Sequence, residues 1–276
     1  MDMHIHTSYS DGYYNVKEII AMLKQKGIET FSITDHDSIE SINDLKKCDL
    51  EFYNGIELSS KIGEFNIHIL GYGFDPNNDK IKELCDEIKT SRIERTEEII
   101  RILIEEKGII FNDGDLKELY MKKTILGKVH IIDLMHKYGY GNTNREIYYK
   151  YLKDIRNTAN EFRINSKAAI EAIKKAGGIA VLAHPKDFES EYNLNANDLI
   201  PWLTAQGLEG IEVYNSLHTK IDTERYFKMA IKHKLLISGG SDFHGGLSKP
   251  DVKLGEVTSE GLKIKQLSLV DHLRKR

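Results

Sequence analysis

Short apolar segments that alternate with helical patterns are the feature that most constrains the fold of this chain. A strand that is followed by a helix and a further strand is typical of a parallel sheet, because the crossover connection needs a helix-length segment. About seven such units predict a barrel rather than an open sheet. The segments are Met1–His6, Thr30–Thr34, Phe52–Leu58, Phe65–Gly71, Ile179–Ala183, Gly210–Tyr214 and Leu235–Ser238.

Helical patterns lie between most of these segments. Val16–Lys26 carries one apolar stripe and stops at Gly27, a residue that commonly ends helices. Ser166 is expected to cap a helix that runs through Lys175, and Tyr226–His233 predicts a helix before the last strand. The tight link Ser59–Glu64 instead predicts a local hairpin.

The alternation stops between Asp75 and Asn165, where only helical patterns are found. We therefore expect an α/β barrel domain from residues 1–74 and 166–276, with an all-helical insertion domain over 75–165 that caps one end of the barrel. The expected helices of the insertion are Lys80–Lys107, Asp113–Met121, His130–Tyr138 and Asn144–Asn160.

Charge and cysteine content narrow the possible environments. The chain has 276 residues, a net charge of −4 and a pI near 6.3. Duplex nucleic acid is recognised through a basic face, so this composition argues against nonspecific binding of duplexes. Cys48 and Cys85 show no pairing pattern, no signal peptide precedes the first strand, and no apolar run approaches a membrane span. We expect a cytoplasmic protein that does not bind membranes.

Histidine and carboxylate side chains stand at the end of every predicted strand, and no cysteine does. His4 and His6 are two residues apart, so they point to the same face of a strand. In barrels, the ends of the strands meet at one face. The candidate metal ligands are His4, His6, Asp11, His36, Glu57, His68, His184, Asp242 and His244. Nitrogen and oxygen donors suit Zn²⁺, Mn²⁺ or Fe²⁺, and nine candidates fit three ions that share a bridging carboxylate, for which we favour Glu57.

Each candidate has a plainer interpretation. The paired histidines could be satisfied core residues, Asp11 could be an ordinary turn residue in Ser-Asp-Gly, and His68 alone on an apolar strand would usually be core. Asp35 and Asp37 could orient a ligand histidine or cap the next helix.

The motifs together resemble those of the PHP (polymerase and histidinol phosphatase) superfamily. They are His4-Ile-His-Thr with Ser10-Asp-Gly, Thr34-Asp-His-Asp, Gly55-Ile-Glu, His68-Ile-Leu-Gly-Tyr, Ala183-His-Pro and Gly240-Ser-Asp-Phe-His. Within it, the chain looks most like the stand-alone phosphoesterases that hydrolyse 3′,5′-nucleoside bisphosphates or trim short RNA from the 5′ end. The resemblance implies a distorted (β/α)7 barrel, a helical insertion and a trinuclear metal centre with Mn, Fe or Zn, and with Mg as a further option.

The resemblance also implies how the ligands divide. His4, His6, Glu57 and Asp242 would hold the first ion, Glu57, His68 and His184 the second, and Asp11, His36 and His244 the third. Glu57, His184 and Asp242 would then be central to catalysis. The spacing alone supports only the pooled set.

Several basic residues are candidates for substrate binding. Arg92 and Arg95 continue the apolar stripe of the long predicted helix, so they point inward, where they could grip phosphate or form a structural ion pair. Lys128 and His130 open a helix, which could be an anion site or an ordinary basic start. His218 follows the sixth strand and could be a phosphate donor or a surface histidine.

The sequence therefore predicts a metal-dependent phosphoesterase that acts on a nucleotide or a short single-stranded RNA end. One alternative is a phosphomonoesterase of small molecules, such as histidinol phosphate. Another, of a different class, is a metal-binding scaffold without turnover.

Overall fold

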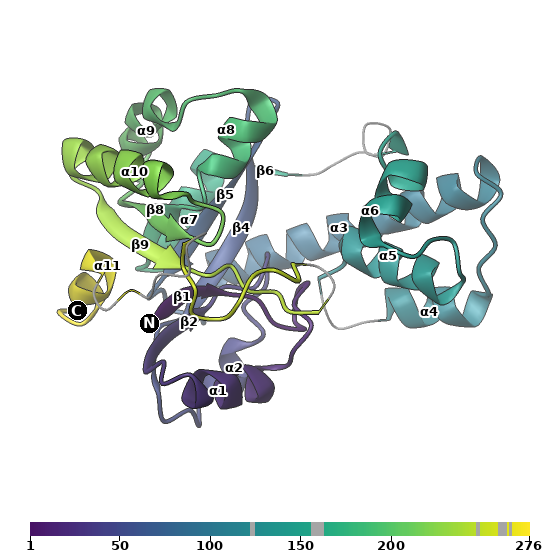
Figure 1. Cartoon of the computed structure of the whole chain (residues 1–276), viewed down its shortest axis with the longest axis horizontal. Coiled ribbons are helices and arrows are strands. Elements are labelled where there is room, and N and C mark those ends of the chain that lie inside the picture. The colour runs from purple at the N-terminus through teal and green to yellow at the C-terminus, as the bar shows by residue number, and fades with distance from the viewer. Residues whose placement is uncertain (122–124, 156–162, 247–248, 259–263, 265–266) are drawn as a thin grey trace.

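Two sheets form the centre of the chain, and helices surround them (Figure 1). The structure is a computed structural model that describes residues 1–121, 125–155, 163–246, 249–258, 264 and 267–276. The first sheet is parallel, with the order β1 (Asp2–Ile5), β2 (Thr30–Ile33) and β3 (Glu51–Phe52). The second sheet has the order β6 (Ile164–Asn165), β4 (Gly55–Ile62), β5 (Phe65–Tyr72), β7 (Ile179–Leu182), β8 (Gly210–Asn215) and β9 (Leu236–Gly240).

The predicted hairpin is confirmed. Strands β4 and β5 are antiparallel and fully paired from Gly55 with Tyr72 to Ile62 with Phe65. Gly63 has a φ of 56°, a backbone conformation that glycine adopts without steric cost. Strand β5 is also antiparallel to β7, so the second sheet is mixed rather than wholly parallel. This hairpin brings His68 on β5 beside Glu57 on β4.

A closed barrel is not confirmed, because the described strands form two separate sheets. Single bridges join the two sheets, between Ile5 and Phe243 and between His36 and Glu57. Near the first bridge, β9 approaches β1 so closely that a Cβ on Gly240 would lie 2.3 Å from the backbone nitrogen of His4. The strands thus converge where the candidate ligands are, without continuous pairing.

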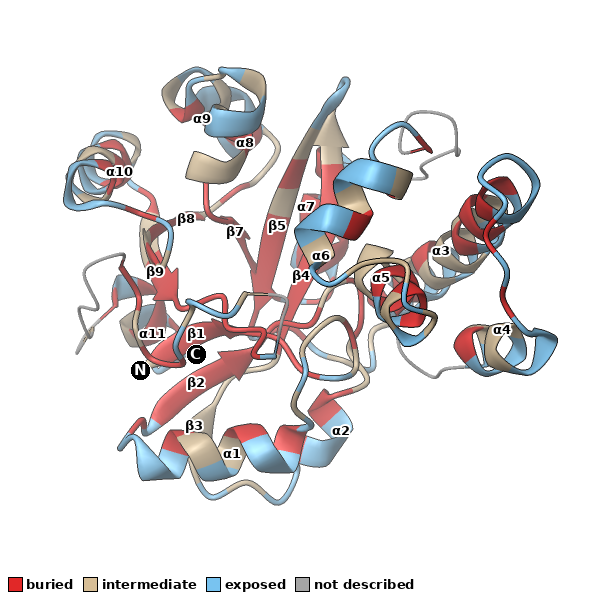
Figure 2. Ribbon diagram, turned by 45° about the vertical axis from the view of Figure 1, so that its right-hand side comes forward, coloured by how far each residue is buried: buried red, intermediate tan, exposed pale blue. Residues whose placement is uncertain are grey.

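The helices cover the outer faces of both sheets, and most residues of the strands between them are buried (Figure 2). They are α1 (Val16–Gln25), α2 (Ile42–Leu45), α7 (Ser166–Lys175), α8 (Lys186–Tyr192), α9 (Ala196–Ala205), α10 (Lys220–His233) and α11 (Ser268–Leu273). Two sequence predictions are corrected here. Helix α7 is capped by Asn165, whose side chain accepts from the N–H of Lys167, and α10 starts at Lys220 because Thr219 caps it.

Between β5 and β6, the described residues form helices only. These are α3 (Asp79–Glu105), α4 (Asp113–Tyr120), α5 (Lys128–Lys137), α6 (Asn144–Ile147) and the π-helix η1 (Tyr148–Leu152). The end of the predicted helix Asn144–Asn160 lies outside the described residues. No described helix is both long enough and apolar enough to cross a membrane.

The helical segment has a hydrophobic core of its own. Its buried members come from residues 99–155 alone and include Leu103, Met135 and Ile147. The first half of α3, with Ile81 and Ile88, instead packs into the core of the second sheet. Figure 1 shows α3 running from the sheet into the group formed by α4, α5 and α6. The insertion domain over residues 75–165 stays a prediction, and in the structure α3 contributes residues to both hydrophobic cores.

We predict that Leu103→Ala loosens the helical unit without loosening the sheets. Leu103 is fully buried in the helical core, and such a truncation typically costs about 2–5 kcal/mol. Amide hydrogen exchange should accelerate in α4 and α5 and stay slow in β4, β5 and β7. Ile104→Ala is the matched control, because the side chain of Ile104 is 41% exposed. Equal acceleration in the sheets would contradict a separate helical unit.

Candidate metal centre

The structure brings all nine candidate ligands together at the ends of the strands. Their ligand atoms form overlapping sets within which all atoms lie within 4.8 Å of one another. The sets are His6, Asp11, His36 and His244; His4, His6 and Asp242; His4, Glu57 and His184; and His36, Glu57 and His68. Segments that are more than two hundred residues apart in the sequence, such as β1 and the loop after β9, therefore share one site.

The carboxylate of Glu57 lies at the centre of this cluster and is fully buried. Its Oε1 lies 2.8 Å from Nδ1 of His68 and 2.8 Å from Nε2 of His184. Its Oε2 lies 3.1 Å from His36, 3.2 Å from His6 and 3.3 Å from His4. Because each oxygen faces a different group of imidazoles, Glu57 is placed as a bridging ligand would be.

Electrostatics keep Glu57 ionised. Burial alone would raise the pKa of its carboxyl, but His36, His68 and His4 outweigh that effect and hold the pKa well below its usual range.

Two further carboxylates stand on either side of the imidazoles. Oδ1 of Asp11 lies 3.3 Å from Nε2 of His244 and 3.5 Å from Nδ1 of His6. Oδ1 of Asp242 lies 3.2 Å from Nε2 of His6, and its Oδ2 pairs with Lys249. Asp242 has a φ of 56°, a backbone conformation that residues other than glycine rarely adopt. Such backbone conformations often occur at functional sites.

The donor set fits divalent metal ions. Nδ1 of His36 and Oε2 of Glu57 are buried and form no hydrogen bond within the described structure. Buried polar atoms usually have a partner, so an ion is a fitting partner for atoms that converge in this way. Imidazole and carboxylate donors without thiolates suit Zn²⁺, Mn²⁺ and Fe²⁺.

Glu212 on β8 supports two of the candidate ligands at once. Its Oε1 accepts from Nδ1 of His4 at 3.0 Å, and its Oε2 accepts from the backbone N–H of His184 at 2.8 Å. A carboxylate on the far nitrogen of a ligand histidine fixes its tautomer and raises its basicity. The sequence shows Glu212 at a strand end, but it does not show that the side chain turns to His4 rather than to the cluster.

Two more buried aspartates order the loops that carry ligands. Asp35 accepts from the N–H and the hydroxyl of Thr7 and from the hydroxyl of Ser10, each at 2.7 Å, and so fixes the loop before Asp11. Asp2 accepts from the N–H of Ser241 at 2.8 Å and from its hydroxyl at 2.6 Å, next to Asp242. An acidic residue inside an apolar strand is the signal that could have identified Asp2.

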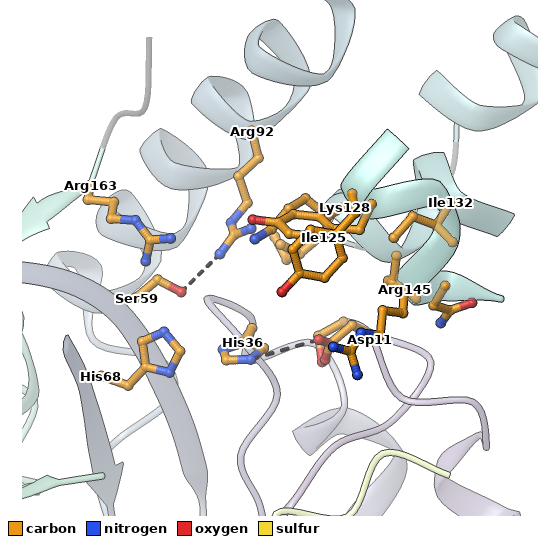
Figure 3. A pocket seen from close by; sticks show the side chains of 16 residues that line it. Asp11, His36, Ser59, His68, Arg92, Ile125, Lys128, Ile132, Arg145 and Arg163 are labelled. Atoms are coloured by element: carbon orange, nitrogen blue, oxygen red, sulfur yellow. Dashed lines mark hydrogen bonds and ion pairs between the residues drawn. The ribbon is translucent and has the colours of Figure 1, made fainter. Parts of the chain in front are cut away.

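A pocket of about 450 Å³ opens above the cluster, between the sheets and the helical unit (Figure 3). Asp11, His36 and His68 line its lower side, and Arg92, Ile125 and Lys128 face them from α3 and from residues 125–128. Arg163 and Arg145 lie at opposite ends of the view, near His68 and near Asp11 respectively. Tyr148 and Tyr149 of η1 are also part of the wall.

Arg92 and Lys128 are the predicted substrate-binding residues that reach this pocket. The guanidinium of Arg92 is held by Asp37, by the hydroxyl of Ser59 at 2.9 Å and by the carbonyl of Leu126 at 3.3 Å. It thereby fastens α3 to the loop after β2 and to β4. Both the phosphate clamp and the structural ion pair remain compatible with this position, and substrate binding by Arg92 stays a prediction.

The other predicted substrate residues do not line the pocket. Arg95 is half-buried on α3 and lies outside the lining set. Nδ1 of His130 accepts from the N–H of Gly127 at 3.1 Å, and His130 lines a separate pocket with Asp115 and Glu118. His218 is buried, its Nδ1 donates to the carbonyl of Val213 at 2.9 Å, and its ring packs on Tyr226. Sequence periodicity cannot distinguish these orientations.

Comparison with known proteins is consistent with a metal site at this cluster of histidines and carboxylates. Residues 2–193 match the PHP domain. A phosphoribosyl 1,2-cyclic phosphate 1,2-diphosphodiesterase of Eggerthella lenta is 27% identical, over 95% of this chain and 98% of its own. A 3′,5′-nucleoside bisphosphate phosphatase of Chromobacterium violaceum is 27% identical, over 88% of this chain and 87% of its own. A 5′-3′ exoribonuclease of Haemophilus influenzae is 28% identical, over 88% of this chain and 89% of its own.

Solved structures share the fold over nearly the whole chain. A protein of Bifidobacterium adolescentis, provisionally described as a metal-dependent phosphoesterase, superposes with a TM-score of 0.84 at 25% identity and covers 99% of this chain and 94% of its own. An amidohydrolase of Chromobacterium violaceum with bound sulfate and no metal gives 0.81 at 26% identity, over 99% and 95%. The chain belongs to the PHP domain family. It is an enzyme of the metal-dependent phosphoesterase class.

We predict that Glu212→Gln weakens metal binding by about tenfold to a hundredfold, because the neutral amide no longer orients and polarises His4. Competition with a chelator during Mn²⁺ titration measures the affinity directly. Glu209→Gln is the control, because Glu209 directly precedes β8 and pairs with Lys174 rather than with a candidate ligand. Unchanged affinity in the Glu212 variant would show that Glu212 only serves the backbone of His184.

Proposed function

We propose that this enzyme hydrolyses a phosphate ester of a nucleotide, either a 3′,5′-nucleoside bisphosphate or the 5′ end of a short RNA. The observation that carries the proposal is a cluster of nine metal-ligand candidates that opens directly into a pocket lined by Arg92, Lys128, Arg145 and Arg163. Two full-length relatives are named for these substrates, a bisphosphate phosphatase and an exoribonuclease. The proposal for this chain rests on the residues of the site together with its similarity to these two relatives.

The proposed ligand sets follow the distances. Glu57, His68 and His184 would hold one ion, and Asp11, His36 and His244 another. His4, His6 and Asp242, together with the second oxygen of Glu57, would hold a third. When bound, such ions lower the pKa of a water molecule and neutralise charge on phosphate oxygens.

The residues of the chain then position the ester. Arg163 lies near His68 and Ser59, where its guanidinium can hold the oxygens of the phosphate that is hydrolysed (Figure 3). Arg92 holds Ser59 and Asp37 in place beneath it. The helical unit covers the pocket from above and limits access of bulk water. The proposal thus has three parts. The centre holds three ions, the helical insertion acts as a lid, and the substrate is a phosphate ester of a nucleotide.

A second candidate is a cyclic phosphodiester of a phosphorylated ribose. The observation in its favour is the coverage of the alignment. The relative named for phosphoribosyl 1,2-cyclic phosphate aligns over 98% of its own chain and 95% of this one. Both candidates are sugar phosphates that carry a phosphate group besides the one that reacts. Histidinol phosphate, the alternative raised by the sequence, does not.

We predict that kcat/KM with added Mn²⁺ is highest for a 3′,5′-nucleoside bisphosphate or a 5′-phosphorylated RNA oligomer. The same assay includes phosphoribosyl 1,2-cyclic phosphate and histidinol phosphate. A best rate on the cyclic phosphate would replace the first candidate by the second. A best rate on histidinol phosphate would refute both, because the pocket would then bind a substrate with one phosphate.

We also predict that Glu57→Gln lowers turnover by about a thousandfold or more, since charge at the metal cluster is lost. The exposed turn residue Glu64 provides the control Glu64→Gln. Bound metal per chain is measured in parallel, and a value near three is expected for the wild type. Near-normal turnover of the Glu57 variant at saturating metal would contradict a bridging role.

A further inference from the structure

His184 makes a second polar contact, through the ring nitrogen that does not face Glu57. Its Nε2 lies 2.8 Å from Oε1 of Glu57, and its Nδ1 lies 3.1 Å from Oδ2 of Asp187, within hydrogen-bonding distance. Asp187 is three residues further along the chain, in the first turn of α8. Its backbone N–H also donates to the carbonyl of His184 at 3.0 Å. The short turn between β7 and α8 therefore brings a carboxylate behind a candidate metal ligand.

The chemistry of this contact determines which nitrogen of His184 is available to a metal ion. An ionised carboxylate accepts hydrogen bonds and cannot donate one, so Nδ1 must carry a proton where the ring approaches Asp187. A neutral imidazole with a proton on Nδ1 has its lone pair on Nε2, the atom that lies beside Glu57 in the cluster. Asp187 thus favours the tautomer of His184 that binds metal through Nε2.

Glu212 holds the same histidine by a different contact. Its Oε2 accepts from the backbone N–H of His184 at 2.8 Å, while its Oε1 accepts from the ring of His4. This contact fixes the backbone of His184 but not the rotation of its ring. Asp187 acts on the ring itself, through Nδ1. The two carboxylates therefore hold different parts of one candidate ligand.

Asp187 has a plainer interpretation as a residue that stabilises its own helix. The helix dipole favours acidic side chains in the first turn, and Asp187 and Glu189 both stand in the first turn of α8. Glu189 forms an ion pair with Arg225, so it is unsuitable for comparison. Asp198 stands in the first turn of α9 and is exposed. Comparison of Asp187 with Asp198 therefore separates an effect on the helix dipole from an effect on His184.

We infer that Asp187 is a positioning residue of the metal centre, which fixes the tautomer and the rotation of the His184 ring so that Nε2 faces the ion shared with Glu57 and His68. The inference rests on the ligand sets of the proposed function. It deepens them, because it names a residue outside the nine candidates on which one of the ions depends. In this role Asp187 contacts neither the ion nor the substrate, and its effect on hydrolysis passes through His184.

The exposure of Asp187 sets the expected size of its effect. Its side chain is 44% exposed and lines a pocket of about 220 Å³ together with His68 and Arg163, whereas Glu212 is fully buried. Water screens the charge of a partly exposed carboxylate, so its interaction with an imidazole is weaker than that of a buried one. Loss of an outer partner of a metal ligand typically lowers metal affinity by about tenfold to a hundredfold. For Asp187 the lower end of that range is expected.

The first test measures the affinity for Mn²⁺ by competition with a chelator, in the wild type, Asp187→Ala, Asp187→Asn and the control Asp198→Ala. Asp187→Ala should weaken the binding of one of the ions by about tenfold. Asp187→Asn should lie between Asp187→Ala and the wild type, because the amide oxygen still accepts from Nδ1 but carries no charge. Asp198→Ala should leave the affinity unchanged. Equal affinities in all four proteins would refute the inference, and so would equal losses in the two alanine variants.

The second test observes the ring of His184 by NMR, in Zn²⁺-loaded protein with isotope-labelled histidine. The signal of the His184 ring N–H is identified by its absence from His184→Gln. Its proton should exchange slowly with water in the wild type and in Asp187→Asn, where Nδ1–H has an acceptor, and faster in Asp187→Ala. A role limited to the helix would leave this exchange rate unchanged. The same rate in the wild type and in Asp187→Ala would therefore overturn the inference.

Neither measurement needs a substrate, so the inference and the proposed function can fail separately. If no tested phosphate ester is hydrolysed while Asp187→Ala still changes Mn²⁺ affinity and proton exchange, the proposed substrate is wrong and the role of Asp187 stands. If hydrolysis is found and both readouts are unchanged in Asp187→Ala, the role of Asp187 is refuted alone. If the wild type binds no divalent ion, the proposed metal centre fails and the role of Asp187 fails with it.

Discussion

The burial of Glu57 is the constraint on which the rest of the structure depends. A carboxylate that is fully removed from water is costly unless it is paired and hydrogen-bonded. Five imidazoles surround it: His68 and His184 are hydrogen-bonded to one oxygen, and His4, His6 and His36 lie within 3.3 Å of the other. Those histidines come from strands and loops throughout the fold, so the strands must converge at this point. The same arrangement is what a bridging metal ligand requires.

Three further carboxylates hold the candidate ligands and their loops in place. Glu212 holds His4 and the backbone of His184, Asp35 holds the loop before Asp11, and Asp2 holds the segment before Asp242. None of these three is itself a candidate ligand. The single bridges between the sheets, in place of continuous pairing, leave the strand ends free to carry such loops. Precise placement of ligands is therefore obtained from side-chain hydrogen bonds rather than from a closed ladder.

The helical unit is joined to the site through few but well-connected residues. Arg92 on α3 reaches Asp37 after β2 and Ser59 on β4, and the N–H of Ile125 donates to the carbonyl of Tyr9 at 3.2 Å. The second half of α3 meanwhile belongs to a separate core. The wall of the pocket, which includes Arg145 and Arg163, and the metal-ligand cluster therefore come from different parts of the fold.

The sequence by itself determined the chemistry of the centre and most of the strands. His4 and His6 could be recognised because the period of two in a strand places alternate residues on one face, and Asp242 and His244 because they follow the last predicted strand in the motif Gly240-Ser-Asp-Phe-His. The hairpin of β4 and β5 and the run of helices after residue 75 followed from turn residues and from periodicity. These are local properties, and local properties are what a sequence pattern records.

Only the tertiary structure decided which side chains meet. Arg92 was expected to point inward, where it could grip phosphate or form an ion pair, and only the structure shows that its guanidinium contacts Asp37, Ser59 and a backbone carbonyl. His130 and His218 turn to nearby backbone groups, while Arg145 and Arg163, which no motif marks, reach the pocket. The orientation of a long or ring side chain depends on partners from distant segments. That information exists only once the two sheets and the helical unit are packed together.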